Sequence, residues 1–319
     1  MAIQFGNTEN EELIDSNISD SEQTEQNENN IEGDEYTPIE EVNDDTTIKG
    51  LNIVEQNDPN KISVTVADKN APLVILFGPP DCGKTMTLVR LTRFLRSIGY
   101  TISPIRNFRP DYDKNYEYLC NNFDSMINDT DAAKSTSLIS FMLVNIIKDG
   151  RRLCQILEAP GEYYFNPREP QAEFPNYVNT LINGNNRKII AIMVEPDWKN
   201  ETDRRNYVNR ITNLKIKLRP RDRIVFIYNK VDKTNFIISP GKIHTNQALR
   251  QVGYDYPDIF TPFENQNPIT RWWSKYRFDF VPFQTGDYAV SSDGTKTFQE
   301  GAEEYPRHLW SVLLKRIRG

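Results

Sequence analysis

The residues best suited to chemistry form one short motif, GPPDCGKT, at positions 78–85. It fits the pattern G-x-x-x-x-G-K-[ST], in which glycines let successive backbone N–H groups converge on phosphate oxygens without side-chain clashes. In such a loop Lys84 would reach the β- and γ-phosphates, and the Thr85 hydroxyl would bind Mg²⁺. The motif therefore predicts a binding site for the phosphates of a nucleoside triphosphate and its magnesium ion. The residues assigned to this phosphate-binding site are Gly78, Pro79, Pro80, Asp81, Cys82, Gly83, Lys84, Thr85 and Met86.

A second motif, NKVD at positions 229–232, follows an apolar run about 145 residues further on. Asp232 offers two carboxylate oxygens to the ring N–H and exocyclic amine of guanine, a donor pair that adenine lacks. Asn229 would address the other edge of the base, and the stem of Lys230 would lie over the ring. We therefore expect a guanine-reading loop.

Between these motifs, the sequence LEAPGE at positions 157–162 also follows an apolar strand. Glu158 would hold a magnesium-bound water, and the N–H of Gly161 would contact the γ-phosphate. An ordinary turn between a strand and a loop is the alternative interpretation.

The elements around the motifs alternate between apolar runs and amphipathic stretches, which favours a three-layer α/β domain with a mainly parallel sheet. We predict a sheet of six strands in which a hairpin around the turn KDGR, at residues 148–151, is the one antiparallel pair. The expected strands span 73–77, 137–148, 151–157, 189–194, 223–228 and 278–283, and the expected helices span 85–98, 200–218 and a C-terminal stretch with Leu309, Val312, Leu313 and Ile317.

Two stretches, 101–134 and 236–275, interrupt this rhythm, and we interpret them as insertions with local helices. Arg106 and Arg109 in the first could supply an arginine finger, although surface arginines are common. Trp272, Trp273 and Tyr276 in the second would cap the core or form a partner site, with the core favoured.

The charge of the chain is uneven. Of its 45 acidic and 38 basic residues, fifteen acidic residues and one basic residue lie in positions 1–50. The remaining chain therefore carries a net charge of about +7. We expect a disordered acidic tail at 1–50, a linker at 51–70 that contains a short strand at 62–66, and the nucleotide-binding domain at 71–319.

No run of 18 apolar residues occurs and the N-terminus lacks the features of a signal peptide, so a cytoplasmic protein is expected. The three cysteines suit neither a disulfide framework nor a zinc site. Cys82, inside the phosphate loop, is either a redox-sensitive thiol or a small filler. Nothing in the sequence predicts a nucleic-acid partner.

In their order and spacing, the P-loop, the acidic-x-x-Gly sequence and N-K-x-D resemble the G1, G3 and G4 elements of Ras-like and translation-factor-class GTPases. The resemblance covers positions 73–319, and the sequence EAPGE is also similar to bacterial G domains described as double-GTPases. It implies a P-loop G domain that binds GTP and GDP with Mg²⁺, and a protein effector or activating protein as partner.

The resemblance also implies residues for two further elements. The G5 backbone contact would fall at Thr285 and Gly286, although QTGDY lacks the usual S-A-K. A switch I threonine should lie just before the hairpin and help to bind the metal. Thr136 is the first candidate; Thr130, Ser135, Ser137 or a plain polar loop are the alternatives.

The chain departs from the family's pattern at two carboxylates. Glu158 stands where the family usually has Asp, which would shift the metal shell by about one methylene. Glu162 stands where the family has a water-orienting Gln or His, and its charge would oppose a γ-phosphate. With Lys84, Gly161 and Glu162 as catalytic residues, we expect a GTPase switch with slow or partner-dependent hydrolysis. A P-loop ATPase and a nucleotide-binding interaction module without useful turnover are the alternatives.

Overall fold

A computed structural model describes residues 51–66, 68–128, 141–290 and 296–319 of the 319-residue chain. The predicted acidic tail lies outside this range. So do the switch I candidates Thr130, Ser135, Thr136 and Ser137, and their predicted roles stay untested.

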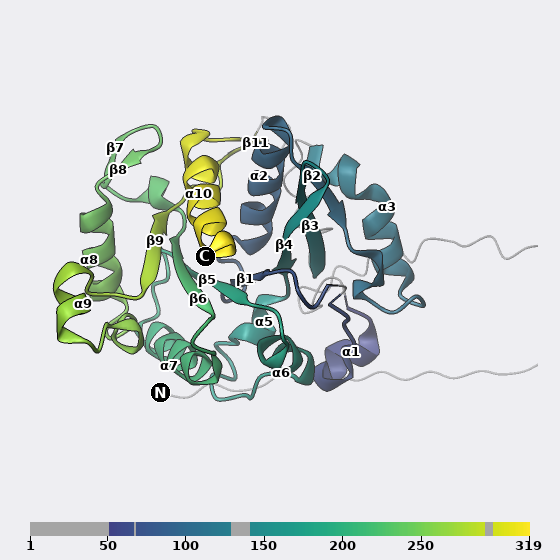
Figure 1. Ribbon diagram of the computed structural model, residues 1–319, viewed down its shortest axis with the longest axis horizontal. Coiled ribbons are helices and arrows are strands. Elements are labelled where there is room, and N and C mark those ends of the chain that lie inside the picture. Colours follow the sequence, from purple (N-terminus) through teal and green to yellow (C-terminus); the bar gives the residue numbers. More distant parts are fainter. Residues whose placement is uncertain (1–50, 67, 129–140, 291–295) are drawn as a thin grey trace, which may run out of the picture. The chain divides into compact units, whose positions relative to one another are not determined.

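A seven-stranded sheet forms the centre of the domain (Figure 1). All five residues of the strand β1 are buried, as expected for the apolar run LVILF between two parallel neighbours. The strands lie in the spatial order β2 (Thr101–Pro104), β3 (Met142–Lys148), β4 (Arg151–Glu158), β1 (Leu73–Phe77), β5 (Lys188–Val194), β6 (Arg223–Tyr228) and β9 (Phe278–Pro282).

The strands β4, β1, β5, β6 and β9 run parallel to one another, so their carboxyl ends meet at one edge of the sheet. The predicted three-layer α/β class is confirmed. Two details were wrong, because the sheet has seven strands and β2 also pairs antiparallel with β3. This edge strand lies in the stretch 101–134, and it is short and ends at a proline, which weakens its pattern in the sequence.

Helices cover both faces of the sheet (Figure 1). On one face α2 (Lys84–Ser97) lies beside α10 (Glu304–Arg318) and α3 (Lys114–Asn128); the other face carries α6 (Asn176–Asn183) and α7 (Glu201–Lys217). The side chain of Asn200 caps α7 by accepting a hydrogen bond from the Asp203 N–H.

Shorter elements complete the described chain. They are the helices α1 (Ile53–Asn57), α5 (Gly161–Tyr164), α8 (Thr245–Asp255) and α9 (Pro268–Trp273), the 3₁₀ turns η1 (Pro59–Lys61), η2 (Arg106–Phe108), η3 (Val231–Lys233) and η4 (Thr261–Phe263), and the hairpins β7 (Ile237–Ser239) with β8 (Lys242–Ile243) and β10 (Asp287–Val290) with β11 (Lys296–Gln299). None of the described helices has the length and apolar character needed to cross a membrane.

Residues 62–66, expected as a short strand, belong to none of the strands that the structure describes. Ile62 is nevertheless buried in the main hydrophobic core, and Val64 and Val66 pack against that core, so residues 62–66 pack against the domain. Its alternating pattern reflects side chains that pack against the domain, and the Thr65 N–H donates a hydrogen bond to the carbonyl of Phe108.

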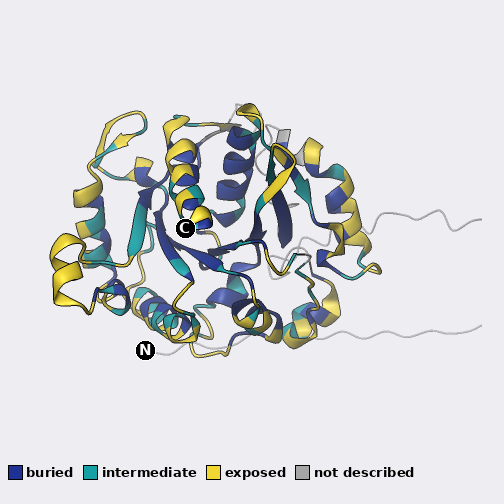
Figure 2. Cartoon of the chain, in the orientation of Figure 1, coloured by how far each residue is buried: buried dark blue, intermediate teal, exposed yellow. Residues whose placement is uncertain are grey.

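The favoured core position of Trp272 and Trp273 was wrong. Their exposed fractions are 81% and 79%, and α9 lies at the exposed margin of the domain (Figure 2). Tyr276 does pack against the core through Phe260 and Phe278. The alternative interpretation of the tryptophans, a partner site, stays a prediction.

Candidate functional site

The phosphate loop connects β1 to α2 at the carboxyl edge of the sheet. Gly83 caps α2 with a φ of 88°, and Asp81 has a φ of 59°, so the loop includes two left-handed residues. The Lys84 ammonium lies inside the loop and donates a hydrogen bond of 2.8 Å to the carbonyl of Pro79. The predicted loop therefore has the curled backbone that converging N–H groups require.

Thr85 and Glu158 meet beside this loop, although 73 residues separate them in the sequence. The Thr85 hydroxyl donates to Oε1 of Glu158 over 3.0 Å, and the backbone N–H of Phe141 donates to Oε2 over 2.8 Å. Burial raises the pKa of Glu158, against the opposing effects of Lys84 and the two hydrogen bonds. A bound cation would favour the charged carboxylate.

Gly161 lies directly against the phosphate loop. A Cβ at this position would come within 2.4 Å of the backbone of Pro79 and Pro80. Glu162 follows in the short helix α5, and its charge contributes to the raised pKa of Glu158. The end of β4 and the start of α5 thus bring both predicted acidic residues close to the phosphate loop.

The NKVD loop follows β6 at the same edge. Asn229 is fully buried, and its side-chain amide donates a hydrogen bond of 2.9 Å to the carbonyl of Cys82. Lys230 has a φ of 55° and forms an ion pair with Glu195, which directly follows β5. The second motif is therefore bonded to the first.

Thr285 and Gly286 follow β9 and complete the wall of the site. The neighbouring Gln284 is anchored from α2, because the buried guanidinium of Arg90 donates to its backbone carbonyl. The same guanidinium donates to the carbonyl of Ala302 over 2.6 Å. Arg90 thus ties the helix after the phosphate loop to the predicted G5 segment.

The phosphate loop, the NKVD loop and the segment after β9 open into one pocket of about 330 Å³, whereas Glu158, Gly161 and Glu162 are not among its lining residues. It is lined by Asp81, Gly83, Lys84, Thr85, Met86, Lys230, Asp232, Lys233, Thr285 and Gly286. The lining combines residues of the phosphate loop with the carboxylate of Asp232. This arrangement suits a ligand with an anionic part and a base.

The Thr85 hydroxyl and the Glu158 carboxylate are hard oxygen ligands of the kind that Mg²⁺ prefers. The described residues contain no group of three or more His, Cys, Asp or Glu side chains that could hold a metal ion. A magnesium site that takes one or two protein ligands and completes its shell with phosphate oxygens and water fits this donor set.

No protein-family model matches the sequence, and no curated protein does. Many solved structures are similar to this chain, and two of them are a nucleolar GTP-binding protein and a Roco2 protein. The nucleolar GTP-binding protein 1 of Plasmodium falciparum is 14% identical with a TM-score of 0.37, and the match covers 80% of this chain and 92% of that one. The Methanosarcina barkeri Roco2 RocCORdC structure, bound to GDP, is 9% identical with a TM-score of 0.31, and the match covers 80% of this chain and 52% of that one.

Most of the predicted site residues lie together, but some alternatives do not survive. Arg109 is buried and ion-paired with Glu55 and Asp113, so it is not an arginine finger. Burial raises the pKa of the Cys82 thiol to about 11, which favours its interpretation as a small filler. Arg106 is exposed in η2.

Four residues that contribute to the site were missed by the sequence analysis. Lys233 lines the pocket, Glu195 pairs with Lys230, Arg90 anchors Gln284, and Phe141 holds Glu158. Glu195 carries a signal in the sequence because it directly follows a buried parallel strand, and Lys233 carries one because it directly follows Asp232. The other contacts depend on how distant segments pack.

Proposed function

We propose that this chain binds GTP and GDP together with Mg²⁺ and hydrolyses GTP slowly or with the help of a protein partner, as a molecular switch. The observation that carries this proposal is the single pocket shared by Lys84, Thr85 and Asp232. A phosphate-binding loop alone would fit any nucleotide, but a carboxylate in the lining of the same pocket favours guanine.

In this proposal Lys84 and the backbone N–H groups of the phosphate loop bind the β- and γ-phosphates. Thr85 and Glu158 hold Mg²⁺, which when bound neutralises charge on the phosphate oxygens. The Gly161 N–H faces the γ-phosphate, since this glycine lies against the loop at Pro79 and Pro80. Each group binds or orients a part of the nucleotide.

At the other end, Asp232 accepts from the ring N–H and amine of guanine, and the stem of Lys230 lies over the base. The ion pair between Lys230 and Glu195 fixes the direction of that side chain. Thr285 and Gly286 supply backbone contacts to the base edge.

Slow turnover follows from the acidic residues near the γ-phosphate. Glu162 can orient a water molecule, but its charge repels the phosphate. A partner that supplies a positive charge would offset this repulsion. A binding module without useful turnover is the second candidate, and the charge of Glu162 near Glu158 favours it because this charge opposes a γ-phosphate.

Competition binding and single-turnover hydrolysis test the proposal. With Mg²⁺ present, unlabelled GTP and GDP should displace a fluorescent GTP analogue, whereas ATP should not at the same concentrations. Equal displacement by ATP would favour the ATPase alternative. Single-turnover hydrolysis, measured with and without cell extract, separates the switch from the binding module. The variant Lys84→Ala serves as the control for background hydrolysis.

A further inference from the structure

Phe141, the residue directly before β3, has an unusual backbone conformation. Its φ is 65°, in the left-handed region that a bulky side chain rarely adopts. Such a conformation persists only where the surrounding structure imposes it. The backbone of Phe141 is therefore held by its neighbours.

These neighbours surround the buried ring of Phe141. The ring centroids of Phe108 and Tyr177 lie 5.4 Å and 5.3 Å away, both nearly edge-on. The guanidinium carbon of Arg109 lies 5.0 Å from the ring centroid, within the range of a cation–π contact. Arg109 is thus the one charged group among these three neighbours of the ring.

The backbone N–H of Phe141 donates to Oε2 of Glu158, while Oε1 of Glu158 accepts from Thr85. The conformation of Phe141 therefore sets the direction of the carboxylate that faces Thr85. Its effect on the site passes through this one hydrogen bond.

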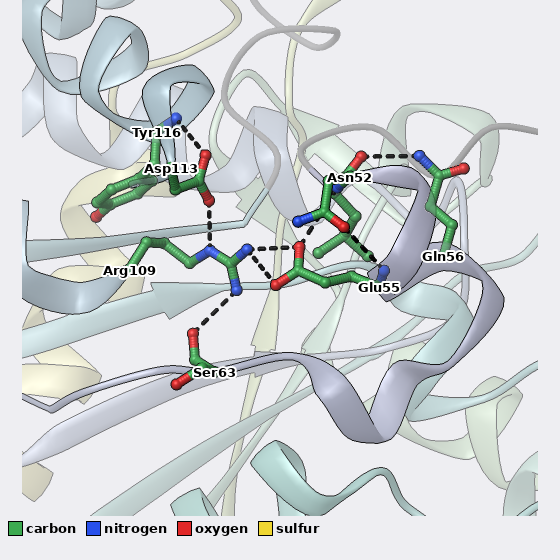
Figure 3. A network of polar contacts seen from close by, with 8 residues as sticks. Asn52, Glu55, Gln56, Ser63, Arg109, Asp113 and Tyr116 are labelled. Atoms are coloured by element: carbon green, nitrogen blue, oxygen red, sulfur yellow. Dashed lines mark hydrogen bonds and ion pairs between the residues drawn. The ribbon is translucent and has the colours of Figure 1, made fainter. Parts of the chain in front are cut away.

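Arg109 is held in turn by three partners (Figure 3). One of its terminal nitrogens donates to both carboxylate oxygens of Glu55 at 2.6 Å, Nε donates to Asp113 at 2.8 Å, and the other terminal nitrogen donates to the carbonyl of Ser63 at 3.0 Å. The side chains of Arg109 and Glu55 are only 1% and 5% exposed. A buried guanidinium needs such compensation, since removing one partner leaves charge unpaired.

Glu55 and Ser63 both belong to residues 51–63, which we name the N-terminal clasp. Glu55 also completes a capping box with Asn52 at the start of α1, so its carboxylate is fixed within the clasp. Two of the three partners of Arg109 therefore come from a segment more than 40 residues away in the sequence.

We propose that Arg109 and Phe141 are positioning residues for the magnesium carboxylate Glu158, and that the N-terminal clasp holds them in place through Glu55. This inference rests on the proposed function of the site, because it assigns Glu158 to Mg²⁺. The clasp acts on the metal without contacting the nucleotide. It therefore affects binding only where Mg²⁺ takes part.

The test compares Glu55→Gln with the native protein, with Glu201→Gln as the matched control. Glu201 forms an exposed ion pair with Arg205 within α7, and neither residue is assigned to the site. Binding of a fluorescent GTP analogue is titrated with Mg²⁺ and repeated in EDTA. In Glu55→Gln the Mg²⁺ concentration at half-saturation should rise roughly 3- to 10-fold, the scale of weakening one hydrogen bond to a charged group. Binding in EDTA should change less than about 2-fold.

A second variant, Arg109→Lys, keeps the charge and loses the planar fork, so it gives a milder change of the same kind. Phe141→Leu completes a double-mutant cycle with Glu55→Gln. If Glu55 acts through the ring, the two effects on the Mg²⁺ requirement should not add. Additive effects, or an unchanged Mg²⁺ requirement in folded Glu55→Gln and Arg109→Lys, would overturn the proposal.

Amide hydrogen exchange of the nucleotide-free protein separates this inference from the proposed function. The Phe141 N–H should exchange at least about 10-fold faster in Glu55→Gln than in the native protein or in Glu201→Gln. A native protein that bound no GTP would contradict the proposed function, but the exchange rate would still show whether Glu55 positions the backbone of Phe141. An unchanged exchange rate in Glu55→Gln would overturn the positioning role that we propose.

Discussion

The side-chain amide of Asn229 donates a hydrogen bond to the backbone carbonyl of Cys82, across 147 residues of sequence. The NKVD loop is therefore bonded to the phosphate loop. A Cβ on Gly83 would come within 2.3 Å of the same amide nitrogen, so glycine at this position leaves the contact room. The NKVD loop and the phosphate loop are fixed relative to each other by this contact.

Replacing Asn229 should weaken both the fold and nucleotide binding. Asn229→Ala leaves the Cys82 carbonyl without its donor, which costs about 1–3 kcal/mol when the group is buried. Asn229→Asp should be worse, because a carboxylate would face that carbonyl. Chemical denaturation and GTP titration check both variants. An Asn229→Asp protein as stable as Asn229→Ala would show that the amide does not donate in this way.

Gly161→Ala should lower GTP affinity by roughly 10-fold or more, because its Cβ cannot enter the space at the backbone of Pro79 and Pro80 without moving the phosphate loop. Gly253→Ala is the matched control. It lies in α8, where an added Cβ would make only an ordinary contact, at 3.7 Å from the ring of Phe260. The control should keep native affinity, and equal affinity in both variants would contradict the packing of Gly161 on the loop.

Local patterns predicted much of this arrangement. The run LVILF and the following glycines identify β1 and its loop because burial and backbone freedom leave a mark within a few residues. The NKVD loop could be placed for the same reason. Its closeness to the phosphate loop could be expected from parallel strands whose ends share an edge.

Contacts between distant segments could not be predicted in this way. Arg90 reaches the carbonyl of Gln284 across 194 residues, and nothing near either residue indicates the other. The exposure of Trp272 and Trp273 could not be predicted either, because hydrophobicity favours burial without showing whether any segment covers the side chain. Phe141 gave no sign of its left-handed backbone.

Alkaline pH should destabilise the protein through Cys82. Its pKa is raised by burial from the ordinary 9.0 to about 11, so the folded state holds this proton more tightly than the unfolded state. The resulting stability is complete below about pH 9 and is lost as pH rises towards 11. At about pH 10.5 the loss due to this thiol should be about 2 kcal/mol.

Cys82→Ala isolates this contribution from the other groups that titrate in the same range. Urea denaturation at about pH 8 and about pH 10.5 should show a smaller loss of stability in the variant than in the native protein. An equal loss in both proteins would mean that the thiol ionises as readily in the folded state as in the unfolded state.

Recognition of guanine by Asp232, in the pocket that the phosphate loop also lines, is central to the proposed function. The most direct test measures the affinities of Asp232→Asn for GTP and xanthosine triphosphate with Mg²⁺, beside the native protein and the exposed control Asp111→Asn. The amide introduced by Asp232→Asn presents one acceptor and one donor in place of two carboxylate acceptors, which matches xanthine. GTP affinity should fall by roughly 100-fold or more, since two hydrogen bonds to a charged group are lost, and xanthosine triphosphate should become the preferred ligand. Undiminished GTP affinity in Asp232→Asn would contradict the account.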